Sequence, residues 1–539
     1  MAILTLKGLE DKAAWEKAGI STPGFDVAAL KAETKKNPRW VHVGPGNIFR
    51  GYIAALAQNL IESGKITSGI TALSTFDHQI LEKIYDPYDD LALQVIMHAD
   101  GSLDKNVIAS VGESLKADSS DPAEFERAKE IFRCPELQMV CFTITEKGYH
   151  IKNMDGEFLP AVLSDFERKT TIPQNGMAII TALLLERFEN GAAPIAMVSM
   201  DNFSHNGDKL FDSIITVAGK WVENGLAPAE FKAWLSDRSK VGFPWSMIDK
   251  ITPRPDASVS KSLSESGFES TELVITDKNT YIAPFVNAEA PQYLVIEDSF
   301  PNGRPPLEDA GVYFVSRETV DQVERMKVCT CLNPLHTAMS IFGCLLGYTS
   351  IAAEMKDDAL AALVNIIGRD EGMPVVTDPK ILSPEAFLKE VVEVRLPNPY
   401  IPDTPQRIVT DTSQKLGIRF GETIKLYRAS DKLDTADLKC IPLSIAAWCR
   451  YLMGIDDDGN KFEISSDPLL AQLTEYISGL ELGNPASVGE SLKPILSNRH
   501  IFGLDLYEDG LGKRIEDYVA EMLEGKGAVR KLLEKTVKA

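Results

Sequence analysis

The amino-acid sequence predicts an α/β protein in which a doubly wound parallel sheet is followed by a mostly α-helical C-terminal domain. Up to about residue 200, short apolar strands alternate with helices, which is the pattern of a parallel sheet covered on both faces. A Pro- and Gly-rich stretch at 301–306 then marks a linker, and the long segments beyond it have helical periodicity. A chain of 539 residues is too long for one core. We therefore expect two domains, 1–298 and 299–539.

The expected elements follow from apolar periodicity and from turn residues. Residues 1–38 are polar and are expected to form helical pieces around the first domain. Strands are expected at 40–43, 68–76, 91–97, 106–112, 137–145 and 194–200, with a turn at 100–101. Helices are expected at 48–63, 121–133 and 176–191, then near 335–354, 357–368, 384–395, 441–454, 468–478 and 513–536.

Composition narrows the class of protein. The net charge of −22 repels nucleic acid and anionic membranes, so neither is an expected partner. The seven cysteines lie mostly in apolar runs, as reduced core cysteines do, and no Cys/His pairs have zinc-finger spacing, so no metal site is expected. The chain start has no signal-peptide pattern, and no 18-residue apolar run is present. We expect a cytoplasmic protein that is a monomer or a small homo-oligomer.

The segment Gly44-Pro45-Gly46-Asn47-Ile48-Phe49 follows a strand and opens a helix. Small residues let a pyrophosphate approach the backbone, and the helix start offers free N–H groups. Phe49 stands where the full dinucleotide fingerprint has a third small residue, so a tight turn without a ligand is the alternative interpretation. Arg50 is a candidate partner of phosphate.

The usual ribose-binding acid is missing from its expected position. It should follow the turn by about 20 residues, yet nothing acidic follows the second strand until Asp77. Thr75, with Ser74, is a candidate substitute. We expect NAD as the cofactor, and NADP is not excluded.

A second group, Lys327, Asn333 and His336, lies in a strongly apolar segment, where polar groups cost several kcal/mol to bury without partners. Asn333 and Pro334 suit an N-cap and the first position of a buried helix. A lysine amine in a dry pocket can accept a proton near neutral pH, and an amide and an imidazole can hold a developing oxyanion. This combination suits alcohol–ketone interconversion. The alternative is a capping asparagine, a structural histidine and a lysine that reaches solvent.

Seven ordered motifs set this group in context: VHVGPGNIFRGY, FTITEKGY, VSMDNFSHNG, IDKITPR, VIEDSFPNGRPPLEDAGV, ERMKVCTCLNPLHTAMSIFG and RLPNPYIPDTPQRIVTDTSQKL. Together, over about residues 40–530, they resemble the mannitol dehydrogenase family of polyol and sugar-acid dehydrogenases. The resemblance implies a Rossmann-type N-terminal domain, a helical C-terminal domain and a site between them.

The resemblance also implies roles for individual residues. Lys327 matches the general base, Asn333 and His336 the pair that holds the oxygen, Asn202 a second amide, and Glu324 a carboxylate that helps the proton leave. Gly44, Gly46 and Phe49 match the cofactor turn, with Glu146 near the nicotinamide and Asp249 near cofactor or substrate. The residues in the motif that resembles the substrate-facing one are Arg395, Asn398, Arg407 and Lys415, and a surface or capping role is the alternative for each.

The sequence departs from the family pattern in the spacing of its lysine and asparagine. In the family the asparagine follows the lysine by five positions, with four residues between them, whereas here Asn333 follows Lys327 by six positions. One extra residue turns a helical side chain by about 100°. A one-residue bulge, an irregular segment before Asn333, or a different base would each account for this.

Three basic residues near the expected substrate face, Arg395, Arg407 and Lys415, favour a substrate that carries a carboxylate. We therefore expect reversible reduction of a ketohexuronate, fructuronate or tagaturonate, to mannonate or altronate. A polyol 2-dehydrogenase acting on mannitol and fructose is the nearest alternative, and a non-catalytic dinucleotide-binding protein on the same fold is another.

Overall fold

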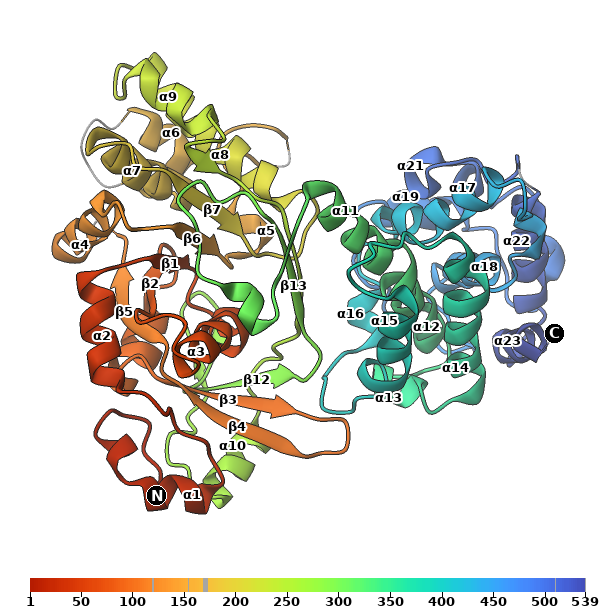
Figure 1. Cartoon of the computed structure of the whole chain (residues 1–539). Coiled ribbons are helices and arrows are strands. Elements are labelled where there is room, and N and C mark those ends of the chain that lie inside the picture. The colour runs from red at the N-terminus through yellow and green to blue at the C-terminus, as the bar shows by residue number, and fades with distance from the viewer. Residues whose placement is uncertain (119–120, 154, 168–172, 509, 539) are drawn as a thin grey trace. The chain divides into compact units, whose positions relative to one another are not determined.

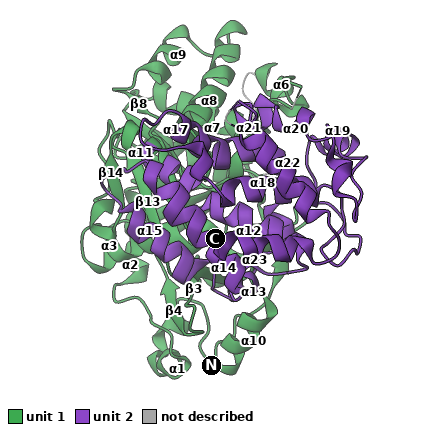
Figure 2. Cartoon of the chain, turned by 90° about the vertical axis from the view of Figure 1, so that its right-hand side faces the viewer, with its two compact units in different colours: residues 1–321 green, residues 322–539 purple. Residues whose placement is uncertain are grey.

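The computed structural model describes residues 1–118, 121–153, 155–167, 173–508 and 510–538 (Figure 1). The chain forms two compact units, Met1–Asp321 and Gln322–Ala539, which are coloured separately in Figure 2. The division expected from the linker lay at 298/299. Residues after that linker return to the first unit, because β14 (Tyr313–Val315) pairs in parallel with β13 (Tyr293–Glu297).

The first unit is built on a six-stranded sheet with the order β5-β2-β1-β6-β7-β8. Every neighbouring pair in this sheet is parallel, which confirms the doubly wound parallel sheet. The strands are β1 (Trp40–Val43), β2 (Ile70–Ser74), β5 (Val111–Lys116), β6 (Met139–Phe142), β7 (Ile195–Ser199) and β8 (Val241–Gly242). The order reverses between β1 and β6, and ligands of such sheets bind at the carboxyl ends of the strands at this switch point.

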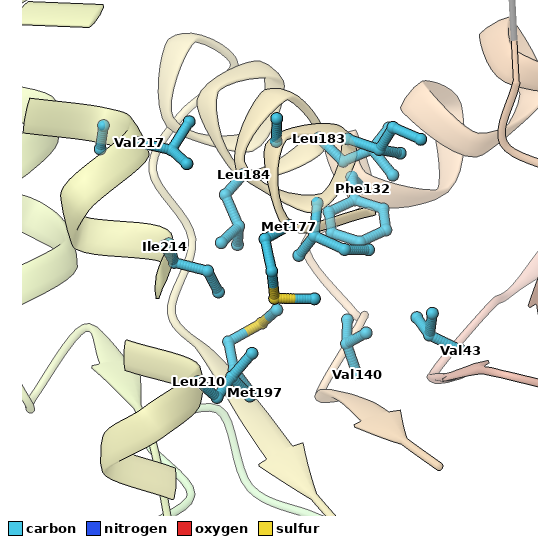
Figure 3. Packing of buried hydrophobic residues seen from close by; sticks show 14 of the residues in the cluster. Val43, Phe132, Val140, Met177, Leu183, Leu184, Met197, Leu210, Ile214 and Val217 are labelled. Atoms are coloured by element: carbon cyan, nitrogen blue, oxygen red, sulfur yellow. The ribbon is translucent and has the colours of Figure 1, made fainter. Parts of the chain in front are cut away.

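Side chains of the sheet alternate between two apolar cores, as strand geometry requires. On β6, Val140 and Phe142 enter one core, while Met139 and Cys141 enter the other. The first core lies against α4 (Pro122–Arg133), α7 (Gly176–Glu189) and α8 (Asn206–Glu223), and Figure 3 shows this packing. Each fully buried side chain of this kind contributes about 1.5–3 kcal/mol. The sheet edge that carries the candidate site is therefore rigidly supported.

Smaller sheets complete the first unit. One contains β3 (Ala92–Met97), β4 (Leu103–Ile108) and β12 (Phe285–Glu289), a second contains β9 (Ser246–Asp249), β13 and β14, and a third is the hairpin of β10 (Val274–Ile275) and β11 (Tyr281–Ile282). The antiparallel β3–β4 pair confirms the hairpin expected around residues 100–101. The single strand expected at 106–112 is wrong, because these residues belong to two strands, the end of β4 and the start of β5. The sequence from Val107 to Val111 is mostly apolar and gives no sign of the break between the two strands.

The second unit is mostly helical, as expected. Its longer helices are α12 (Asn333–Leu345), α14 (Asp358–Asn365), α15 (Pro384–Glu390), α17 (Glu422–Arg428), α18 (Cys440–Tyr451), α19 (Leu470–Tyr476), α22 (Leu511–Met522) and α23 (Ala528–Lys538). The helix expected at 335–354 ends early, and a separate turn, α13 (Ile351–Glu354), follows Gly347, whose φ is +78°. The helix expected at 513–536 is divided at Gly525 and Gly527, which also have positive φ.

Helical structure is continuous from Arg317 to Leu345, through α11 (Arg317–Arg325), a π-helical turn (Met326–Cys331) and α12. By length and composition alone this run is long and apolar enough to cross a membrane. However, 78% of its apolar window is buried inside the protein, which is how the core helix of a globular unit looks.

Candidate functional site

Four segments that carry predicted site residues lie at the carboxyl end of the parallel sheet. Three of them were predicted to bind the cofactor, and the fourth carries Asn202, which was predicted as a second amide near the reacting oxygen. Gly44–Gly46 follow β1, Thr75 follows β2, Glu146 follows β6 and Asn202 follows β7. Because the carboxyl ends of parallel strands share one edge, the fold brings these segments together at the switch point. Glu146 and Asn202 are exposed there.

The turn after β1 has the geometry that a phosphate needs. Gly44 has a φ of +92°, and a Cβ at this position would overlap the carbonyl oxygen of Thr143 and lie 2.9 Å from Ile144 Cγ2. A Cβ on Gly46, in contrast, would meet nothing within 4 Å. Helical structure begins at Asn47, whose side-chain amide donates to the carbonyl oxygen of Tyr281 at 3.0 Å. The backbone is thus open to a ligand above Gly46, at a helix start.

The two larger side chains of the turn point into the protein. Phe49 is fully buried and stacks on His42, with ring centroids 4.2 Å apart, while Ile48 is half-buried. Arg50 is 2% exposed, and its Nη2 donates to the carbonyl oxygens of Ala283 and Pro284. The expectation that Arg50 pairs with phosphate is corrected, since a π-helical turn (Phe49–Ile53) directs its guanidinium to the 283–284 backbone.

The end of β2 offers hydroxyl groups where an acid is usual. Thr75 is half-buried there, next to Gly176 at the start of α7. Asp77 is buried, and its Oδ2 accepts hydrogen bonds from Thr276 (2.6 Å) and Thr280 (2.5 Å). Its carboxylate therefore fastens the β10–β11 hairpin. Asp249, which ends β9, is also buried and belongs to a different sheet.

The two glycines give a matched pair of predictions. Gly44→Ala should lower the free energy of unfolding by about 2–4 kcal/mol, because the new Cβ meets backbone at a strained φ. Gly46→Ala should leave that free energy within about 1 kcal/mol but weaken dinucleotide binding at least roughly tenfold, because its methyl group fills the space for the pyrophosphate. Urea unfolding and a fluorescence titration with NADH measure both effects. Unchanged NADH affinity in Gly46→Ala would refute the cofactor turn.

In the second unit, the π-helical turn accounts for the unusual spacing of Lys327 and Asn333. The N–H of Leu332 donates to the carbonyl oxygen of Lys327 at 3.1 Å, an i→i−5 bond that accommodates one extra residue. The one-residue bulge considered from the sequence is therefore present. Lys327 is 5% exposed, so its amine does not extend into bulk water. Glu324, three residues earlier in α11, is half-buried.

Asn333 does not cap the helix, contrary to expectation. The N-cap is Leu332, and Asn333 and Pro334 are the first two residues of α12. Asn333 cannot act as the cap because helical structure continues through the π turn almost to Asn333, and no extended residue precedes it. Among the described residues, the Asn333 side-chain amide makes no hydrogen bond. Thr337 Oγ1 donates to the backbone carbonyl oxygen of Asn333 at 2.8 Å, not to the side chain. The amide remains available for a ligand.

His336 occupies the first turn of α12 beside a carboxylate that sequence reasoning missed. Its Nε2 lies 3.3 Å from Oδ2 of Asp403, and Oδ1 of Asp403 accepts from Arg407 Nε at 2.7 Å. Burial lowers the pKa of His336 to about 4; Asp403 opposes this shift, while Arg407, Arg419 and Arg395 add to it. The ring is thus neutral at pH 7, so its approach to Asp403 is not an ion pair.

Three arginines lie close enough to His336 to lower its pKa, and only two of them were predicted from the sequence. Arg395 is 5% exposed, whereas Arg407 is largely exposed. Arg419, which was not predicted, donates to Thr337 Oγ1 in α12, and burial lowers its pKa to about 10. A signal for Asp403 existed, because Asp403 and Arg407 stand four residues apart at a helix start.

The other two predicted substrate residues are engaged locally. Lys415 donates to the carbonyl oxygens of Ile408 and Thr410, and burial lowers its pKa. Asn398 is buried, and its Oδ1 accepts from the N–H of Tyr400 at 3.0 Å. Both therefore shape the loop that carries Asp403 and Arg407.

The lowered pKa of His336 predicts how stability depends on pH. An unfolded histidine binds a proton near pH 6.5, but the folded ring does so only near pH 4, so the folded state loses stability as pH falls between these values. The full loss is about 3 kcal/mol. His336→Asn should lack this loss, whereas His500→Asn, at an exposed position, should keep it. Urea unfolding at pH 7 and pH 4 measures the difference, and parallel curves for wild type and His336→Asn would refute it.

The two units together have the parts of a dinucleotide-dependent oxidoreductase. The first has an open glycine turn at a helix start on the switch point of a parallel sheet, which fits a dinucleotide. The second has a buried amine, a free amide and a neutral imidazole at a helix start. Among the described residues, no group of three or more His, Cys, Asp or Glu side chains could hold a metal ion.

Comparison with known proteins agrees with this class. The chain matches the mannitol dehydrogenase Rossmann domain over residues 38–309 and the mannitol dehydrogenase C-terminal domain over residues 319–523. It belongs to the mannitol dehydrogenase family. It is 53% identical to D-mannonate oxidoreductase of Thermotoga maritima over 536 residues, which cover 99% of each chain. It is 28% identical to mannitol 2-dehydrogenase of Emericella nidulans over 480 residues, which cover 87% of each.

Solved structures confirm the fold. The ternary complex of Pseudomonas fluorescens mannitol 2-dehydrogenase with NAD and D-mannitol matches with a TM-score of 0.71 and 24% identity over 99% of each chain. A substrate-free D-sorbitol dehydrogenase matches with a TM-score of 0.76 and 25% identity over 97% of each chain. The Rossmann-type domain and the helical C-terminal domain are those of the family, and a nicotinamide dinucleotide is its cofactor.

Proposed function

We propose that this protein reversibly reduces a ketohexuronate to an aldonate, with fructuronate and mannonate as the preferred pair. The proposal depends most on one observation, that three arginines lie close enough to His336 for their charges to lower its pKa: Arg395, Arg407 and Arg419. Guanidinium groups bind carboxylates in a bidentate fashion, and a neutral polyol offers no such partner. The full-length similarity to D-mannonate oxidoreductase supports the same substrate.

The residues of the second unit have distinct roles in this proposal. Lys327 takes the hydroxyl proton during oxidation and returns it during reduction. Asn333, whose amide is not used for capping, and His336, which is neutral, hold the reacting oxygen. Arg395 and Arg419 bind the substrate carboxylate, while Arg407 fixes Asp403 behind the imidazole ring. Glu324 helps the proton leave, and Asn202 of the first unit contributes a second amide.

The first unit would hold the dinucleotide at Gly44–Gly46 and at the start of the following helix, with the ribose near Thr75. When bound, the nicotinamide supplies hydride transfer. We propose NAD rather than NADP, because an acidic residue, Asp118, lies next to the end of β2. The N–H of its neighbour Ala117 donates to the backbone carbonyl oxygen of Ser74, and the Asp118 carboxylate pairs with His78. With Asp77 nearby, this edge carries carboxylates that repel a 2′-phosphate.

A substrate panel tests the proposal. NADH oxidation should be fastest with fructuronate or tagaturonate and at least roughly tenfold slower, in kcat/KM, with fructose, because fructose lacks the charged group. Replacing NADH by NADPH should lower kcat/KM. Turnover of fructose with no turnover of either uronate would support a polyol 2-dehydrogenase instead, and NADH binding without any turnover would support a non-catalytic protein.

A further inference from the structure

A buried carboxyl group lies in the second unit, behind the residues assigned above. Glu354 ends α13 and is 0% exposed. Among the described residues, neither of its carboxyl oxygens has a hydrogen-bond partner. The side chain packs on the backbone of α12 at Gly343, where a Cβ would overlap Oε1. A glycine in mid-helix costs about 1 kcal/mol relative to alanine, and here it makes room for this carboxyl group.

Several ionisable groups face Glu354 from the elements packed around it. Asp403 lies on the segment before α16 (Pro405–Ile408), Asp357 is the N-cap of α14, and Cys344 belongs to α12. Asp357 is itself bonded to Tyr348 and Arg530. Burial raises the pKa of Glu354 to about 9, and Asp403 and Asp357 add to the effect. At pH 7 Glu354 is therefore a neutral carboxylic acid.

Asp403 connects Glu354 to the proposed site. The backbone carbonyl of Asp403 accepts from the N–H of Ile351 at 3.1 Å, which ties the start of α13 to this segment. The carboxylate of Asp403 lies against His336 and binds Arg407. A charge on Glu354 would thus place a second carboxylate behind Asp403, inside a low-dielectric region where charges interact strongly.

We propose that Glu354 is a positioning residue of the His336–Asp403–Arg407 group, which acts by holding a proton and so keeps Asp403 as the carboxylate charge behind the imidazole. When Glu354 loses its proton, its new negative charge attracts the Arg407 guanidinium and raises the proton affinity of His336. The site then binds the substrate carboxylate and the reacting oxygen less well. The catalytic part of this inference rests on the proposed function.

Glu354→Gln tests the proposal, because glutamine keeps the shape and cannot ionise. The wild-type kcat/KM for fructuronate should fall with a midpoint near pH 9, and the ratio of variant to wild type should rise at least threefold between pH 7.5 and pH 10. In Asp357→Asn, which keeps a good N-cap, the midpoint should move to lower pH, since one charge that opposes ionisation is gone. A ratio that stays constant with pH would overturn the proposal.

A measurement without turnover separates this proposal from the proposed function. In protein with 13C-labelled histidine, the His336 ring signal should show an inflection near pH 9 in wild type and none in Glu354→Gln. Glu371→Gln is the matched control: Glu371 is also buried, but it accepts from the N–H groups of Lys439, Cys440 and Ile441, so this variant should keep the inflection. Absence of the inflection in wild type would overturn the proposal even if uronates are turned over. Its presence would uphold the proposal even if they are not.

Discussion

Lys327→Ala is expected to lower kcat by about 10²–10⁴-fold, which is the usual contribution of a general base. Lys327 is 5% exposed and is the second residue of the π turn (Met326–Cys331), which leads to Asn333 and His336. Removing it leaves no group at this position to accept the hydroxyl proton. Steady-state oxidation of mannonate with NAD measures the loss.

Two controls separate chemistry from folding. Lys327→Met keeps the aliphatic length of the side chain and should lose as much activity as Lys327→Ala while binding NADH as wild type does. Methylamine added to Lys327→Ala should restore part of the rate, because a free amine can enter the vacated space. If Lys327→Ala retains more than about a tenth of wild-type kcat, Lys327 is not the base.

Arg395→Gln is expected to lower kcat/KM for fructuronate by about 10–100-fold, which corresponds to the 1.5–3 kcal/mol of a hydrogen bond to a charged group. The same change should leave kcat/KM for fructose within about threefold, because fructose has no carboxylate to lose. The ratio of the two substrates measures the effect free of any change in the amount of folded enzyme.

The Arg395→Gln variant has a second expected effect, on the pKa of His336. The charge of Arg395 helps to lower the pKa of His336, so Arg395→Gln should raise that pKa, and NMR titration of labelled histidine can follow the shift. Arg499, an exposed residue paired with Glu508, provides the control, since Arg499→Gln should change neither quantity. Equal losses on fructuronate and fructose in Arg395→Gln would show that Arg395 supports the fold rather than the carboxylate.

Much of the fold followed from local patterns. Strands and helices alternate in the first half, and the glycine turn after β1 is a local feature of strand, turn and helix, so both were visible in the sequence. The fate of Arg50 was not visible, because its partners at Ala283 and Pro284 lie far along the chain. For the same reason the domain boundary was placed early, since nothing local shows that β14 pairs with β13.

The candidate site shows a similar limit. The spacing of Lys327 and Asn333 raised a question that the sequence alone left with three answers, and the i→i−5 bond at Leu332 supplies one of them. The Asn-Pro pair suggested a cap, but capping preferences do not take account of a preceding π turn. Arg419 was missed because it acts on His336 through tertiary packing, which periodicity does not reveal. Asp403 had a local signal in its spacing to Arg407, but its approach to His336 also depends on tertiary packing.

A crystal structure with NADH and mannonate bound tests the central claim most directly. The account predicts that the mannonate carboxylate lies within hydrogen-bonding distance of Arg395 or Arg419, and that the C5 hydroxyl lies within about 3.2 Å of the Lys327 amine. It also predicts that Asn333 and His336 contact the same hydroxyl oxygen. A carboxylate bound away from these arginines, or a reacting hydroxyl out of reach of Lys327, would contradict the account.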